Sequence, residues 1–133
     1  MKEFSVSFKI TTQMASVDEL VSLTGLPLSA SSHGMGEIGW DGRPFTMTIG
    51  VLEGASDAGD LSAKIQLMLN ALDFARLDAV RTQLPDASFV MDVCVFFDSV
   101  NCSLEIPPDL AEIVGRRNIS ISISCYPTCF EAI

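Results

Sequence analysis

Strict alternation of polar and apolar residues is the feature that most constrains how this chain folds. Residues 4–11, 87–97 and 119–126 each carry apolar side chains at every second position. Side chains of a β-strand point alternately to opposite faces, so the pattern predicts strands with one buried and one solvated side. In the last of the three stretches, the solvated side is a row of serines. These strands therefore predict a sheet with one apolar and one polar face.

Helical segments lie between the strands. Three are predicted, over residues 16–25, 60–84 and 107–115. The first opens with a capping box, in which Ser16 is the N-cap and Glu19 follows three residues later. The second shows apolar residues at helical spacing with a bend near Asp73, and the third opens on a Pro-Pro pair. Each helix has an apolar stripe, which the apolar face of the sheet can cover.

The dipeptide Asp41-Gly42 is the strongest hairpin signal in the sequence. It predicts two strands joined by a tight turn, over residues 37–40 and 43–52. Alternation along the second strand predicts which of its side chains face the core. The inward residues are Phe45, Met47, Ile49 and Val51, and the outward ones are Thr46, Thr48 and Gly50.

A further short strand is predicted over residues 102–106. The order of elements is then β-α-β-β-α-β-β-α-β, within a single domain that spans residues 1–133. Strands with one polar face, interleaved with amphipathic helices, are typical of α+β proteins. We therefore expect a two-layer sandwich, in which three amphipathic helices cover one face of a largely antiparallel sheet.

Composition is that of a globular protein. Apolar residues make up 48% of the 133 residues and charged residues 19%, enough for a core without metal or disulfide. The first residues alternate and hold no continuous apolar run, so no signal peptide is expected. No stretch approaches the roughly eighteen apolar residues of a membrane span. We expect a cytoplasmic protein without membrane association.

The chain is strongly acidic, with a formal net charge of −9. Six acids and no Lys or Arg lie between Arg81 and Arg116. Phosphate backbones repel such a chain, so nucleic-acid binding is not expected, whereas a basic protein partner would be attracted. Solubility alone explains the charge equally well. The candidate partner-binding acids are Glu37, Asp41, Asp92, Asp98, Glu105, Asp109 and Glu112.

Residues 34–39 match the G-x-G-x-x-G pattern of dinucleotide-binding proteins. Such a site needs a strand before the first glycine and a helix after the last, because the pyrophosphate sits on the N–H groups of that helix. Here a serine-rich loop precedes the motif and a hairpin turn follows it. The glycines are therefore interpreted as bends of a loop, and no cofactor is expected.

No set of residues points to catalysis or to a metal site. His33 is the only histidine, no nucleophile motif accompanies it, and the four cysteines lack the ligand set of a zinc site. Asp92 and Asp98 would both reach the polar face as an acid–base pair, but an exposed strand face explains them and is preferred. Cys125 is expected to pack as a small hydrophobe. Next to a tight turn, Trp40 either closes the edge of the core or marks a contact surface, and closure of the core is preferred. No catalytic residue is assigned.

Two longer runs share their order of features with a known family. Residues 18–40, DELVSLTGLPLSASSHGMGEIGW, combine a short helix, a Leu-Pro turn, a variable loop, a Gly and a Trp. Residues 93–126 combine an apolar strand, an Asp-Ser-x-Asn turn, a Pro-Pro helix and a closing strand that ends in Tyr. Together they resemble the small bacterial proteins of the domain-of-unknown-function family 4279, although His33 stands where members often carry Lys.

The resemblance implies a compact α+β fold with no established enzymatic activity. It also implies a set of signature positions, most of which are interpreted as architectural. These positions are Gly34, Trp40, Asp98, Asn101 and Tyr126.

Three functions are compatible with these observations. The leading hypothesis is a non-catalytic protein-binding module, an immunity-protein or antitoxin-like inhibitor that binds a basic bacterial toxin through an acidic surface. The alternative is a small-molecule binder or enzyme with a pocket between residues 29–36 and 98–101, where His33, Glu37 and Asp98 would converge. The third is a homodimer, paired through the polar sheet face or an edge strand. The protein is accordingly expected to be a monomer or a homodimer.

Overall fold

The computed structural model describes residues 2–54, 60–98 and 103–128. They form a sheet of β-strands and a set of α-helices. In chain order the elements are β1 (Lys2–Thr12), α1 (Val17–Thr24), β2 (Thr48–Glu53), α2 (Leu61–Ala71), α3 (Phe74–Gln83), β3 (Ser88–Phe97), α4 (Pro108–Arg116) and β4 (Ser120–Pro127). Within this part of the chain no helix has the length and apolar character needed to cross a bilayer.

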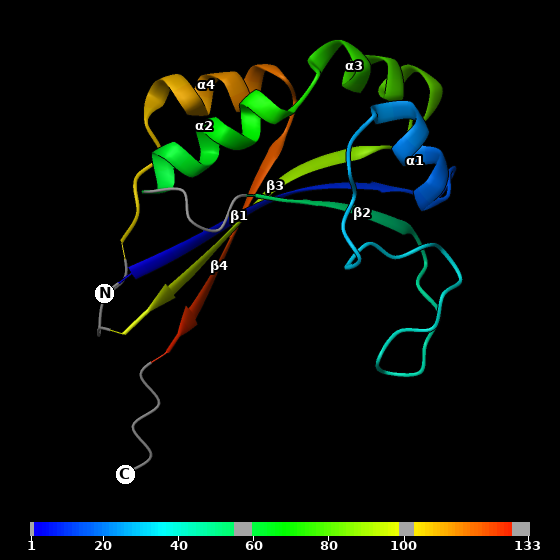
Figure 1. Ribbon diagram of the computed structural model, residues 1–133, viewed down its shortest axis with the longest axis horizontal. Helices are drawn as coiled ribbons and strands as arrows, with labels where there is room; N and C mark the ends of the chain where they lie inside the picture. Colours follow the sequence, from blue (N-terminus) through cyan, green and yellow to red (C-terminus); the bar gives the residue numbers. More distant parts are fainter. Residues whose placement is uncertain (1, 55–59, 99–102, 129–133) are drawn as a thin grey trace.

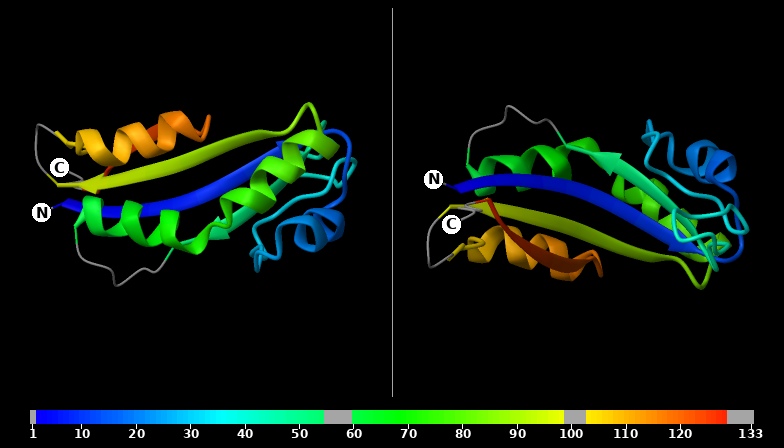
Figure 2. Two further views of the ribbon diagram at one scale, coloured as in Figure 1. Left: turned by 90° about the horizontal axis from the view of Figure 1, so that it is seen from above. Right: turned by 90° about the horizontal axis from the view of Figure 1, so that it is seen from below.

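The strands form one sheet in the order β2-β1-β3-β4. β1 is antiparallel to both of its neighbours, β2 and β3, whereas β3 and β4 run parallel. The helices gather on one side of the sheet and leave its other face uncovered (Figures 1 and 2). The predicted α+β architecture, a helical layer on a sheet, is therefore confirmed.

The helices and the strand directions differ in detail from the prediction. The predicted helix over residues 60–84 is two helices, α2 and α3, so the described residues hold four helices and not three. Asp73 separates the two, because its carboxylate accepts a hydrogen bond from the Arg76 N–H (3.2 Å) and caps α3. The sheet is mixed, because α4 is a crossover connection that returns the chain parallel to β3.

Two of the predicted strands do not form. The chain around Asp41-Gly42 is a hairpin, but its arms share only the isolated bridge between Ile38 and Pro44, and β2 begins later, at Thr48. Pro44 has no N–H to donate to a ladder, which limits pairing there. Residues 103–106 are irregular, and residue 102 lies outside the described residues.

The core lies between the sheet and the helices. Alternation in β1 and β3 turns Phe8, Ile10, Met91 and Val93 toward the helical layer, and all four are completely buried. The ring of Phe8 lies 5.7 Å from that of Phe89, centroid to centroid. The helices contribute the buried residues Leu20, Leu61, Ile65, Met68, Leu69, Leu77, Val80, Leu110 and Val114. For β1 and β3 the predicted buried faces are thus correct.

The two faces of β2 are the reverse of the prediction. Thr48 and Gly50 share the helix-facing side of the sheet, and Thr48 has no exposed surface. A Cβ on Gly50 would lie 2.8 Å from Leu28 Cδ1 and 3.2 Å from Leu20 Cδ1, so the glycine lets α1 and the following loop approach the sheet. Val51 faces the other side and is also buried, at 7% exposure. Alternation does not indicate the orientation of a strand that has buried residues on both faces.

The two edges of the sheet differ. On the outer side of β2, the backbones of His33 and Ile49 exchange two hydrogen bonds of 2.8 Å, and the Ser29 N–H donates to the Val51 carbonyl (2.7 Å). The loop that precedes the hairpin therefore covers this edge. On the outer side of β4, no other strand of the described residues is paired.

On the uncovered face of the sheet, β1 and β4 are largely polar, as predicted, whereas β3 adds Val90 and Phe96. An ion pair lies on this face, between Lys9 Nζ and Asp92 Oδ2 at 2.7 Å. The Asp92 side chain is only 13% exposed, so its charge is largely committed to this pair. The hydroxyl side chains on the same face are Ser5, Ser7, Ser120, Ser122 and Ser124.

Asp86 ties the connection between α3 and β3 to the end of β1. Its two carboxylate oxygens accept hydrogen bonds from the Thr12 hydroxyl and the Gln13 N–H, both at 2.6 Å. These two hydrogen bonds lower the pKa of Asp86 below its ordinary value of 3.8, and the one from the Gln13 backbone has the larger effect. The ionised carboxylate therefore stabilises the folded chain.

Asp86→Asn is expected to lower the stability of the protein at neutral pH. Because the folded pKa lies below the unfolded one, the contribution of Asp86 is complete above 3.8 and is lost as the pH falls through the folded pKa. Urea unfolding at a series of pH values should show a constant gap between the wild type and the variant at neutral pH. The gap should narrow below 3.8, and a gap that is independent of pH would contradict the role of the charge.

Candidate functional site

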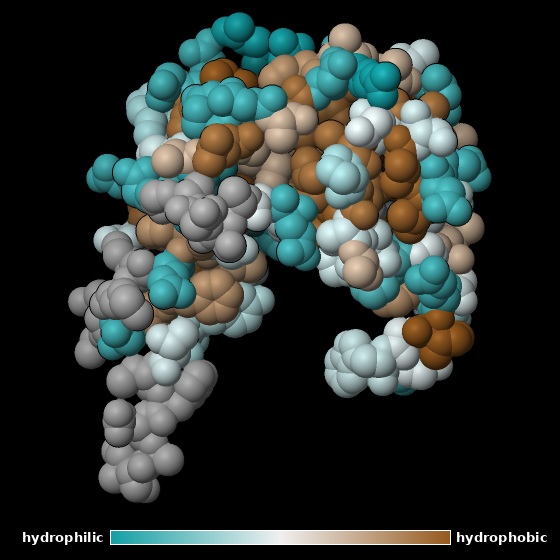
Figure 3. All heavy atoms as spheres, in the orientation of Figure 1, coloured by the Kyte–Doolittle hydropathy of each residue, from teal (hydrophilic) through white to brown (hydrophobic). Residues whose placement is uncertain are grey.

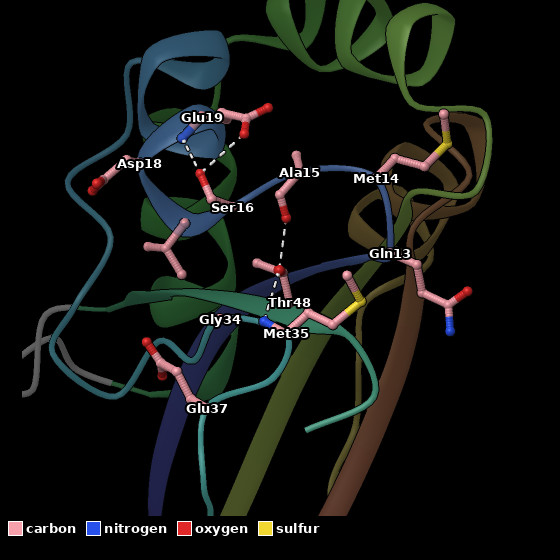
Figure 4. Close-up of a pocket in the computed structure, with 11 residues that line it drawn as sticks. Gln13, Met14, Ala15, Ser16, Asp18, Glu19, Gly34, Met35, Glu37 and Thr48 are labelled. Atoms are coloured by element: carbon pink, nitrogen blue, oxygen red, sulfur yellow. Dashed lines mark hydrogen bonds between the residues drawn. The ribbon is translucent and has the colours of Figure 1, made fainter. Parts of the chain in front are cut away.

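A cavity of about 530 Å³ opens beside the start of α1. Its walls come from the connection between β1 and α1 and from the loop that precedes β2. We call it the acidic pocket. Its lining residues are Gln13, Met14, Ala15, Ser16, Val17, Asp18, Glu19, Gly34, Met35, Glu37 and Thr48 (Figure 4).

Thr48 holds the walls of the acidic pocket together. Its hydroxyl donates to the Ala15 carbonyl (2.6 Å) and accepts from the Met35 N–H (3.2 Å). One buried hydroxyl on β2 thereby joins the two segments that form the cavity, as the dashed lines in Figure 4 show. Because buried backbone groups need hydrogen-bond partners, this side chain fixes the spacing of the walls.

The capping box predicted at the start of α1 forms one side of the pocket. The Glu19 N–H donates to Ser16 Oγ (3.1 Å), and the Ser16 hydroxyl donates to the Glu19 carboxylate (3.3 Å). The box places Asp18 and Glu19 in the first turn, where the helix dipole favours negative charge. The capping box and the helix dipole therefore hold the carboxylates of Asp18 and Glu19 beside the cavity.

The charge and polarity of the lining define what the acidic pocket can bind. Asp18 and Glu19 on α1 lie across from Glu37 on the loop (Figure 4), and no Lys or Arg is among the lining residues. Met14 and Met35 add apolar surface and are 54% and 53% exposed. A cationic group on an aliphatic stem, as in Lys or Arg, matches this combination of carboxylates and thioethers.

The hairpin, residues 36–45, begins at the acidic pocket and extends away from it. The Gly39 N–H donates to the Arg43 carbonyl and the Phe45 N–H to that of Glu37, both at 2.8 Å. Gly42 has a φ of 78°, which the turn requires and glycine adopts freely. Figure 3 shows this segment projecting from the body of the molecule, with open space beside it.

Large apolar side chains at the tip of the hairpin are exposed to solvent. Trp40 is 99% exposed and Ile38 is 68% exposed. The expectation that Trp40 closes the edge of the core is therefore wrong. The hairpin leaves the domain after Gly36, so residues at its tip reach no core. Exposed Trp is characteristic of binding surfaces, where it supplies a large contact area.

The seven acids predicted to bind a partner lie in three separate places. Glu37 and Asp41 are on the hairpin, where the Asp41 carboxylate accepts from the Arg43 N–H (3.0 Å). Asp92 lies on the uncovered sheet face and pairs with Lys9. The remaining four lie after β3 or at α4, which Figure 1 places at the opposite end of the molecule from the hairpin: Asp98, Glu105, Asp109 and Glu112. They do not form one acidic surface.

The sequence does not predict that Asp18 and Glu19 line one pocket with Glu37. The sequence assigns Glu19 to a capping box, and nothing local to Asp18 or Glu19 indicates Glu37 as a neighbour. The capping box places these two acids in the first turn of α1. The pairing of β2 with β1 and the folding-back of the loop bring Glu37 to them.

The structure does not bring His33 and Asp98 together, as the predicted pocket between residues 29–36 and 98–101 requires. His33 bonds to Ile49, which pairs with Thr11 near the end of β1. Asp98 follows Phe97, which pairs with the start of β1. Most of the length of β1, roughly 30 Å, separates the two regions. Residues 99–101 themselves lie outside the described residues.

His33 and the neighbouring glycines have architectural roles. The His33 ring stacks on that of Phe45 at 4.4 Å between centroids, so it packs the base of the hairpin. Gly36 has a φ of 89° and provides the bend into the hairpin. The residues that follow Gly39 form the hairpin turn and not a helix, which removes the structural context of a dinucleotide site.

The described cysteines lie apart. Cys94 pairs in register with Ser124 while Val95 pairs with Cys125, so the two thiols point to opposite faces of the sheet. Burial, together with the Asp92 carboxylate, raises the pKa of Cys94. Cys125 is on the predicted face but is exposed, not packed. Cys102 and Cys129 lie outside the described residues, within which no cluster of three or more His, Cys, Asp or Glu could hold a metal ion.

Comparison of the chain with protein-family models, with curated proteins and with solved structures gives no match. The resemblance to the domain-of-unknown-function family 4279 therefore stays a prediction from sequence.

Proposed function

We propose that this protein is a non-catalytic binding module that engages a basic protein through the hairpin and the acidic pocket. The observation that carries the proposal is the position of Trp40, 99% exposed at the tip of a hairpin whose base lines a carboxylate-bearing cavity. The Trp would supply apolar contact area, and the pocket would receive a Lys or Arg side chain.

The charges support a basic partner. The chain has a net charge of −9, which attracts a cationic protein over a distance, and Glu37, Asp18 and Glu19 receive its charge at close range. Within this proposal, the more specific function is an immunity-protein or antitoxin-like inhibitor that binds a basic bacterial toxin. A toxin whose active surface is cationic would be blocked by such a contact.

Trp40→Ala is expected to weaken binding of the basic partner about 30-fold or more, because an exposed anchor Trp typically contributes about 2 kcal/mol or more at an interface. Glu37→Gln is expected to weaken it about tenfold and to reduce its salt dependence. The probes are the purified basic proteins encoded beside this gene, titrated calorimetrically at two ionic strengths. For a toxin probe, inhibition of its activity is the second readout.

Glu105→Gln is the matched control for Glu37→Gln, because it removes the same charge near α4, away from the hairpin. It should leave the affinity unchanged. Loss of affinity with Glu105→Gln but not with Glu37→Gln would place the contact near α4. Equal affinity of the wild type and Trp40→Ala for every partner found, or no binding by any basic probe, would overturn the proposed site.

A further inference from the structure

Among the residues that the structure describes, nothing gives the outer edge of β4 the usual protection of an edge strand. Natural sheets guard such edges with charged side chains, internal prolines, bulges or a covering loop. β4 has the sequence SISISCYP, with no charged residue and with proline only at its last position. The opposite edge of the sheet, on β2, is covered by the loop that contains Ser29 and His33. The contrast marks β4 as the accessible edge.

The backbone of β4 presents a regular row of hydrogen-bonding groups outward. The Thr128 N–H donates to the Phe97 carbonyl on β3, whereas the Ile119 N–H turns away from β3 to the Val114 carbonyl. Because backbone direction alternates along a strand, the even-numbered residues bond to β3 and the odd-numbered ones point outward. The N–H and C=O groups of Ile121 and Ile123 therefore face the free edge.

The side chains of β4 are also incompletely covered. Ile123 lies next to Val93 on the helix-facing side of the sheet, where Val93 has no exposed surface. Ile123 itself remains 47% exposed, although Ile121 on the same strand packs against the core. An apolar side chain beside a row of free backbone groups is the surface that another β-strand covers.

The sequence of β4 indicates that the strand that pairs with it is β4 of a second copy. Residues 120–124 read Ser-Ile-Ser-Ile-Ser, which is the same in both directions. An antiparallel copy centred on Ser122 would place Ile121 against Ile123 of the second chain, and Ser120 against its Ser124. Serines then meet on the polar face and isoleucines on the helix-facing side. The absence of charge in β4 removes local repulsion between two chains that each carry a net charge of −9.

We propose that the protein forms a homodimer in which β4 pairs antiparallel with β4 of a second copy, around a two-fold axis at Ser122. The two sheets become one continuous sheet with both helical layers on the same side. Because β2 lies at the far edge of each sheet, the two hairpins and acidic pockets stay at the outer ends of the dimer. The dimer is thus independent of the proposed partner contact and presents that contact twice.

Ile123→Lys tests the pairing through the mass of the protein. Ile123 is 47% exposed, so the Lys side chain reaches solvent and the chain keeps its fold. Light scattering over roughly a hundredfold range of concentration should show the wild type as two chains of 14.3 kDa and Ile123→Lys as one. Two lysines beside the two-fold axis should weaken dimerisation about tenfold or more.

Leu67→Lys, on α2, is the matched control, because Leu67 is 48% exposed and lies on the helical layer. It should dimerise like the wild type, and circular dichroism should show that both variants are folded. A wild type that is monomeric throughout the series would overturn the proposal. So would a dimer that survives Ile123→Lys.

Ser122→Cys tests the register. Directly opposed residues at a non-hydrogen-bonded pair have Cα atoms about 4.5 Å apart, within the range that a disulfide spans. Under a mild thiol oxidant, Ser122→Cys should form a covalent dimer, whereas Ser120→Cys, which would face Ser124 of the other chain, should not. Equal cross-linking by both variants and by the wild type would contradict this register.

Discussion

Replacing Phe8 with alanine is expected to lower the free energy of unfolding by about 3–5 kcal/mol, because it removes a large buried ring and leaves a cavity. Phe8 is completely buried in the central strand β1, between Leu52 on β2 and Met91 on β3. Its ring also contacts that of Phe89. Urea unfolding followed by circular dichroism measures the loss.

Trp40→Ala is the control for this prediction and separates stability from binding. It removes a still larger aromatic side chain, but one that is 99% exposed, so the free energy of unfolding should change by about 0.5 kcal/mol or less. A cost at Trp40 as large as that at Phe8 would show that the hairpin packs on the domain. Such a result would also remove the basis for assigning Trp40 to a partner contact.

Thr48→Val is expected to lower the free energy of unfolding by about 1–3 kcal/mol, the cost of leaving buried polar groups without partners. Valine preserves the shape of the side chain but cannot bond to the Ala15 carbonyl or the Met35 N–H. The two walls of the acidic pocket would lose the atom that joins them. Amide hydrogen exchange at Met35 should therefore accelerate along with the loss of stability.

Thr46→Val is the matched control, because Thr46 is exposed and lies two residues earlier in the chain. It should change neither the stability nor the exchange rate at Met35 appreciably. If Thr48→Val proved as stable as the wild type, the buried hydroxyl would not be what holds the pocket together. The proposed docking of a Lys or Arg side chain would then lose its structural support.

Several elements of the fold could be predicted because their causes are local. The capping box of Ser16 and Glu19 starts α1 through contacts between residues three apart. Asp73 caps α3 by an equally local contact, but the sequence predicts only a bend there and not a separate helix. β1 and β3 could be assigned because each has one buried and one solvated face, so alternation reveals both the strand and its orientation. The Asp41-Gly42 turn likewise depends on its own backbone.

Other features could not be predicted because their causes lie in distant parts of the chain. β2 has buried residues on both faces, so its apolar residues do not reveal which side meets the helices. The position of Trp40 beside a tight turn fits both closure of the core edge and a contact surface, and the direction of the hairpin decides between them. The acidic pocket also depends on distant residues, since Glu37 meets α1 only when the sheet has assembled.

By itself, the sequence determined the α+β class, the starts of α1, α2 and α4, which faces of β1 and β3 are buried, and the hairpin turn. Each of these rests on contacts within a few residues or on a strict period. Only the tertiary structure decided the order of the strands, the phase of β2, the meeting of Asp18 and Glu19 with Glu37, and the exposure of Trp40 and of the edge of β4. The physical reason is that burial and proximity are properties of the assembled layers. The local sequence pattern indicates whether a residue favours a buried or an exposed environment. The packing of distant segments determines which environment the residue has in the fold.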